Sequence, residues 1–148
     1  MKKIERVLRD GAAKVFEELC FFSPADEPTP AHGTHITISV PFSGLTEGKL
    51  VVRLVGVPVA ELACNMLGEE SASTEQQNDA LAELGNVLCG HVLPLVWGEQ
   101  AVFDIQRPVV SDVEAPFDAS AHASLELEGG HVELGLAMRR GAIPEGFA

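Results

Sequence analysis

The chain has 148 residues, with 22 acidic and 10 basic side chains, and a formal net charge of −12 at pH 7. Nucleic acids and anionic lipid surfaces both require clustered positive charge, so this composition argues against them as partners. Hydrophobic residues make up 46% of the chain, yet no uninterrupted apolar run approaches the roughly 18 to 20 residues that a membrane span needs. Length and composition predict one soluble domain over residues 1–148.

The N-terminal segment predicts an amphipathic helix from Lys2 to about Phe21, because its apolar residues recur at helical spacing. Charged residues interrupt this segment, so it lacks the continuous apolar core of a signal peptide. We therefore expect a cytoplasmic protein. The next stretch, Phe22 to Gly33, has three prolines and few apolar residues, which is typical of a surface loop.

Two strands and a short helix follow. The segments THITISVPF (34–42) and GKLVVRLVGVP (48–58) have strand patterns, and SGLTEG between them fits a hairpin loop. A short helix is predicted from Val59 to Leu67, because Pro58 suits a first helical turn. Gly68 can end this helix in a left-handed conformation.

A long central helix is predicted next. The sequence TEQQ, Thr74 to Gln77, fits a capping box in which the threonine oxygen accepts from a free backbone amide and the glutamine reaches back. The helix should start near Glu75 and run to about Leu93, since Pro94 either kinks it or marks its last turn.

The C-terminal third predicts strands. AVFDIQRPVV is a strand pattern interrupted at Pro108, SDVEAPFDAS is a loop, and ASLELEGGHVELGLAMR is a hairpin around Gly129 and Gly130. The tail from Gly141 is expected to be loosely held. In the hairpin the leucines and valine of one face are Leu125, Leu127, Val132, Leu134 and Leu136, and the glutamates facing outward are Glu126, Glu128 and Glu133.

The order of elements is helix, two strands, short helix, long helix and three strands. Segregated hairpins favour an α+β two-layer domain in which long helices cover an antiparallel-rich sheet. The chain has no glycine-rich phosphate loop and no GxSxG nucleophile elbow, so most familiar enzyme classes are disfavoured.

Neither cysteines nor histidines predict a metal site. Cys20, Cys64 and Cys89 are far apart in apolar surroundings, so we expect small buried hydrophobes rather than ligands or a redox couple. His32 and His35 would point to opposite faces of an extended chain.

The central helix brings polar residues together. Read as a helix, it sets Asp79, Glu83, Asn86 and Gly90 along one side. A carboxamide can both donate and accept, so Asn86 can hold and aim a water molecule, while a glutamate can dock against a partner's cation. The alternative is an ordinary solvated surface. The opposite, apolar side is predicted to carry Leu81, Leu84, Leu88, His91 and Leu95.

The pattern D-x-x-x-E-x-x-N at Asp79, Glu83 and Asn86, followed by Gly90 and by Pro108, resembles the signature of the CheC/CheX/FliY family of chemotaxis phosphatases. The flanking segments GKLVVRLVGVPVAELACNMLGEE, NDALAELGNVLCGHVLP and GAAKVFEELCFF also look like a CheX-type domain. No second motif is present, because the first helix lacks ExxN and the Glu61 and Asn65 pair of the short helix is spaced at i+4. The resemblance therefore implies one site per chain, as in CheX, and a homodimer.

The resemblance implies hydrolysis of the phospho-aspartate of a CheY-like response-regulator receiver. Asn86 would orient the attacking water and Glu83 would pair with a receiver lysine, with Asp79 and Gly90 as further partner-binding residues. The Mg²⁺ belongs to the receiver, so no metal is expected in this chain.

Two alternatives stay open: a non-catalytic module that binds a receiver or another signalling protein, and a structural adaptor whose helix is covered by a second copy. A net charge of −12 gives no long-range steering toward an acidic receiver, so recognition would rest on short-range fit.

Overall fold

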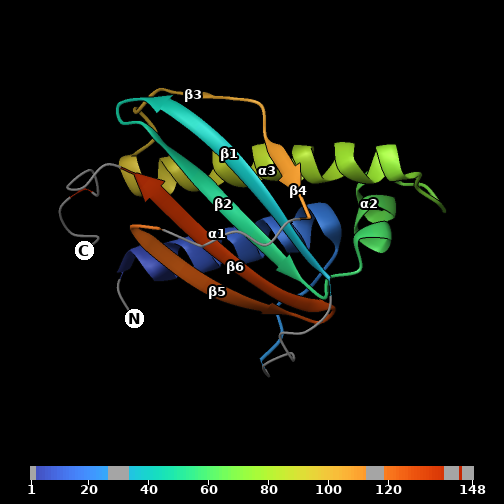
Figure 1. Ribbon diagram of the computed structural model, residues 1–148. Coiled ribbons are helices and arrows are strands. Elements are labelled where there is room, and N and C mark those ends of the chain that lie inside the picture. Colours follow the sequence, from blue (N-terminus) through green and yellow to red (C-terminus); the bar gives the residue numbers. More distant parts are fainter. Residues whose placement is uncertain (1–2, 27–33, 113–118, 139–143, 145–148) are drawn as a thin grey trace.

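A computed structural model describes residues 3–26, 34–112, 119–138 and 144, which form three helices and six strands (Figure 1). The strands make one antiparallel sheet in the order β3-β1-β2-β6-β5, and β4 pairs with β1 on the same side as β3. The predicted α+β architecture is confirmed. The elements are α1 (Lys3–Cys20), β1 (His35–Gly44), β2 (Gly48–Val55), α2 (Val59–Leu67), α3 (Thr74–Trp97), β3 (Phe103–Ile105), β4 (Val109–Ser111), β5 (Ala121–Leu127) and β6 (Gly130–Met138).

The core lies between the sheet and the two long helices, which cover one face of it (Figure 1). α1 packs against β5 and α3, and α3 packs against β1. Strand alternation sends one set of side chains into this layer. Those of the three central strands are Ile38, Val40, Phe42, Leu50, Val52, Leu54, Val132, Leu134 and Leu136, all buried.

α3 is long and apolar enough to cross a membrane by length and composition alone, but half of the relevant stretch is buried inside the protein. Helices in the centre of a globular core share that composition, because they are surrounded by other apolar elements. The burial of α3 under α1 and β1 identifies it as a core helix.

The strand predicted across Pro108 is two short strands. Phe42 of β1 pairs with Ile105, and Ser39 pairs with Val109, so residues 106–108 lie opposite only Val40 and Pro41. One extra residue on one strand is a β-bulge, and proline, which has no backbone N–H, is tolerated at such a position. The prediction of a single interrupted strand missed this bulge.

The predicted cap of α3 is one residue off. The Ser73 hydroxyl accepts from the Gln76 backbone N–H at 3.1 Å, and the Ser73 N–H donates to the Gln76 side chain at 2.9 Å. Because STEQ and TEQQ both satisfy the capping pattern, sequence spacing cannot separate them. α3 continues past the predicted end at Leu93 to Trp97, so Pro94 lies in its last turn, one of the two roles predicted for it.

The other elements agree closely with prediction. α2 spans Val59–Leu67, and Gly68 ends it with a φ of 71°. The predicted hairpin forms, but its turn residues are Glu128 and Gly129 rather than Gly129 and Gly130, since Leu127 pairs with Gly130 and Leu125 with Val132. The predicted loose tail from Gly141 and the predicted loop at 111–120 fall largely outside the described residues, as does His32.

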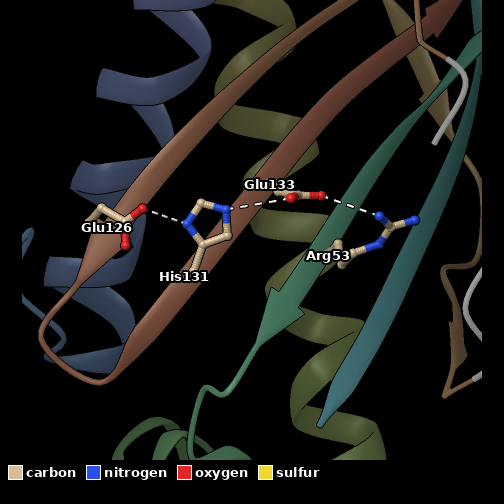
Figure 2. A network of polar contacts seen from close by, with 4 residues as sticks. All are labelled: Arg53, Glu126, His131 and Glu133. Atoms are coloured by element: carbon tan, nitrogen blue, oxygen red, sulfur yellow. Dashed lines mark hydrogen bonds and ion pairs between the residues drawn. The ribbon is translucent and has the colours of Figure 1, made fainter. Parts of the chain in front are cut away.

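A network of polar side chains links β2, β6 and β5 on the sheet face that points away from the helices (Figure 2). His131 Nδ1 lies 2.6 Å from Glu126 Oε1, and its Nε2 lies 3.5 Å from Glu133 Oε1. Glu133 Oε2 accepts from Arg53 Nη1 at 3.3 Å. Glu126 pairs with His131 and Arg53 with Glu133 directly across strands, whereas His131 and Glu133 are neighbours on one face of β6. Such cross-strand contacts stabilise a sheet register.

The cysteines divide into two classes. Cys20 and Cys89 are buried, and burial raises the pKa of each thiol to about 12. Cys64 is half-buried. The prediction of small buried hydrophobes is confirmed for Cys20 and Cys89 and holds only in part for Cys64.

We expect only Cys64 to react with a thiol-selective reagent in the folded protein near pH 8. A raised pKa keeps Cys20 and Cys89 as thiols, and the thiolate is the reactive form. The measurement is the number of thiols titrated before and after adding denaturant, with Cys64→Ser as the control. Rapid labelling of Cys20 or Cys89 before unfolding would contradict it.

Candidate docking and active surface

The predicted polar stripe is present on α3. Asp79, Glu83, Asn86 and Gly90 are all exposed. The residues that should face the core do so in part: Leu81, Leu84 and Leu88 are buried, His91 is half-buried and Leu95 is 43% exposed. Leu95 nevertheless lies on the predicted side of the helix, since its Cδ1 would be 2.9 Å from a Cβ atom placed on Gly11 of α1.

Gly85 lets α3 pack close to β1 and so determines how far the stripe lies from the sheet. A Cβ atom at Gly85 would lie 2.7 Å from Ile38 Cγ2 and 3.0 Å from Val40 Cγ2, closer than side chains normally approach. Only a residue without a side chain lets α3 lie this close to β1. Asn86 follows Gly85 directly, so this contact fixes where the carboxamide emerges.

Gly90 has a different setting. A Cβ atom there would meet only Ile105 Cδ1, at 3.8 Å, which is ordinary van der Waals contact. Gly90 therefore creates no close contact inside the protein. Its place in line with Glu83 and Asn86 leaves a flat exposed spot on the helix, which suits close approach by another backbone.

Two structures flank the stripe. On one side, α1 and α3 border a shallow groove lined by Val15, Glu18, Leu19, Val87 and His91. On the other side runs the link between β3 and β4: Pro108 Cβ lies 3.5 Å from the Cβ position of Gly85. The stripe is thus an exposed ridge between a groove and a sheet edge.

A sizeable hollow of the described chain lies elsewhere. It encloses about 810 Å³ where β1 and β4 meet the first turns of α2 and α3, and neither Glu83 nor Asn86 lines it. A carboxylate and a carboxamide on a ridge cannot enclose a small substrate. They can act on a group that a second protein brings to them.

The Glu61 and Asn65 pair of α2, which has the wrong spacing for a second motif, also has the wrong environment. The Asn65 side-chain amide donates to the Cys20 carbonyl oxygen at 2.8 Å and so ties α2 to the end of α1. Its carboxamide has a structural role. Within the described ranges, the full D-x-x-x-E-x-x-N pattern occurs once, on α3 at Asp79, Glu83 and Asn86.

Metal ligands are not grouped in the described parts of the chain: no three His, Cys, Asp or Glu side chains there could hold a metal ion together. His35, the described member of the predicted histidine pair, has a buried Nδ1 without a hydrogen-bond partner.

Sequence reasoning missed two features of the surface. It did not single out the Arg53, Glu126, His131 and Glu133 network, because a turn at Gly129 and Gly130 would place Glu128 opposite His131, whereas the observed register pairs Glu126 with His131. It also passed over Arg107, which precedes Pro108 and is exposed on the link beside α3. The signal available for Arg107 was its position next to the signature proline.

No protein-family model and no curated protein matches this chain. Solved structures do match over nearly its whole length. The chemotaxis protein CheX from Desulfovibrio desulfuricans superposes with a TM-score of 0.71 at 14% identity, covering 92% of this chain and 99% of that one. CheX from Vibrio vulnificus gives 0.70 at 16% identity, covering 93% and 97%.

A third similar structure is the CheX-CheY-BeF3-Mg²⁺ complex from Borrelia burgdorferi, with a TM-score of 0.62 and 18% identity over 91% of this chain and 97% of that one. Together these matches show that the chain has the CheX fold, as the sequence resemblance implied.

The two glycines of α3 should respond in opposite ways to alanine. Gly85→Ala forces a Cβ against Ile38 and Val40 and should lower the free energy of unfolding by about 1–3 kcal/mol. Gly90→Ala has room and should raise it by up to about 1 kcal/mol through helix propensity. Urea unfolding of both variants checks this. Equal effects would show that Gly85 does not set the contact between α3 and β1.

Proposed function

We propose that the protein is a phosphatase that removes the phosphoryl group from the phospho-aspartate of a CheY-like receiver. The observation that carries the proposal is the exposure of Glu83 and Asn86 on one ridge of α3, at the spacing of the phosphatase motif and in a CheX fold. CheX from Borrelia burgdorferi forms a complex with CheY, which supports a receiver as the partner.

The proposed reaction needs few catalytic groups from this chain. An acyl phosphate is already activated, so its hydrolysis needs mainly an in-line water and neutralised charge on the phosphoryl oxygens. The receiver supplies Mg²⁺ and a lysine, and this chain supplies the guide for the water. No metal in this chain takes part in the proposed reaction.

Asn86 has the right chemistry to aim the water. Its carboxamide oxygen can accept a hydrogen bond from the water, and its amide can donate, without any net charge. A carboxylate in the same place would be repelled by the phosphoryl group and by the receiver's own carboxylates.

Glu83 lies one helical turn before Asn86 and is equally exposed. It is suited to pair with the receiver lysine and so to set the register of the two proteins. Asp79 and Gly90 extend the same surface by one turn on either side, as further contacts to the receiver. The proposal places the protein in the cytoplasm, where it would act as a homodimer with one site per chain.

Asn86→Ala should lower kcat by about a hundredfold or more, because a misplaced water loses the in-line geometry. The measurement is the dephosphorylation rate of phosphorylated receivers from the source organism with Mg²⁺ present. Asn78→Ala, on an exposed residue two turns earlier in α3, is the matched control and should keep wild-type turnover. Rates equal to that of receiver alone, for wild type with every receiver, would refute the enzyme and leave a binding module.

Glu83→Ala should act on binding. We expect KM to rise about tenfold with a smaller change in kcat, because an ion pair that fixes the register contributes to docking before chemistry. Full saturation kinetics distinguish this from the Asn86 effect. A Glu83→Ala enzyme with unchanged KM would remove the docking role.

Burial of Glu83 and Asn86 between two copies of the chain would favour a structural adaptor instead.

A further inference from the structure

The link between β3 and β4 runs along α3 beside the stripe. Val110, Ser111 and Asp112 line a hollow together with Asn78 and Leu81 near the start of α3. Halfway along the helix, Pro108 lies against the Cβ position of Gly85, and further on Ile105 lies against that of Gly90. The two segments therefore run antiparallel, and Arg107 falls level with Asn86.

Arg107 belongs to the bulge. Residues 106–108 oppose only Val40 and Pro41 of β1, so one residue has no partner in the ladder. Gln106 keeps a backbone hydrogen bond to the Pro41 carbonyl oxygen at 2.9 Å, and Pro108 packs on α3. Arg107 lies between these two anchored residues and is exposed. Bulges often redirect a side chain next to functional sites.

The charge of Arg107 contrasts with its surroundings. α3 contains no lysine or arginine, and its exposed stripe carries the carboxylates of Asp79 and Glu83. Among the described residues, no carboxylate forms an ion pair with Arg107, whereas Arg9 and Arg53 are paired with Asp10 and Glu133. An arginine presents a rigid fork of donors that matches a carboxylate.

We propose that the receiver's footprint extends from the α3 stripe across the sheet edge to the β3–β4 bulge, where Arg107 binds a carboxylate on the receiver surface. The proposal rests on the proposed function and deepens it. Glu83 and Arg107 then form a pair of opposite charges on either side of Asn86 in the docked surface. Two such contacts fix orientation as well as position, which one ion pair cannot do.

The test compares Arg107→Gln, Arg107→Lys and Arg6→Gln in the full chain. Arg6 is an exposed arginine on α1 that borders a groove near Leu95 of α3. Its substitution changes the net charge by the same amount, but away from the bulge. Affinity is measured by titration with the receiver in its BeF3-Mg²⁺ form and in its unphosphorylated form, and kcat and KM are measured with the phosphorylated receiver.

We expect Arg107→Gln to weaken binding of both receiver forms about three- to tenfold, with kcat unchanged and the loss shrinking at high salt. Arg107→Lys should recover part of the affinity, and Arg6→Gln should change it little. A loss confined to the BeF3-Mg²⁺ form would place Arg107 on the phosphoryl group and overturn the surface-carboxylate contact.

Failure of the inference differs from failure of the proposed function. Equal effects of Arg107→Gln and Arg6→Gln, with Asn86→Ala still inactive, would overturn the footprint and leave the phosphatase in place. Weakened binding by Arg107→Gln without any acceleration of phosphate loss would keep the footprint and remove the phosphatase. Absence of binding to every receiver would overturn both.

Discussion

The close contact between α3 and β1 at Gly85 is the constraint on which the surface depends. Because Ile38 and Val40 occupy the space where a side chain would be, α3 can pack this close to the sheet only with glycine at position 85. Asn86 follows Gly85, and Glu83 lies one turn before it, so both inherit their positions from this contact. Each of the two glycines lowers the stability of the helix by about 1 kcal/mol relative to alanine, and at Gly85 close packing offsets this loss.

That constraint also explains why a catalytic role needs no cleft here. A packed helix in the core presents a rigid outer ridge, and rigid elements hold polar groups more accurately than loops do. On the proposed function the partner brings the phosphoryl group, the metal and a lysine, and the ridge adds a water guide and a docking charge. The hollow at the start of α3 is then irrelevant to the reaction, since Glu83 and Asn86 are not among its lining residues.

The sequence predicted what depends on local periodicity. The α2 bounds, the buried face of the β5–β6 hairpin and the exposure of all four stripe residues follow from helical and strand spacing, and the structure confirms them. Features that depend on tertiary contacts could not be predicted from the sequence. The bulge before Val109 is defined by the pairing of β1 with two short strands at once, and the partial exposure of Leu95 depends on how α1 packs against the end of α3. The cap at Ser73 was missed because two overlapping segments satisfy one pattern.

The distribution of charge bears on how such a protein would choose its partner. With a net charge of −12, the chain repels an acidic receiver at long range, so encounter gains nothing from steering. Short-range pairs of opposite sign must then select the correct complex, and the stripe offers an anion at Glu83 while the bulge offers a cation at Arg107. Weak attraction has a consequence for turnover. A phosphatase has to release the receiver once the phosphoryl group is gone, and a complex held by a few exposed charges dissociates quickly.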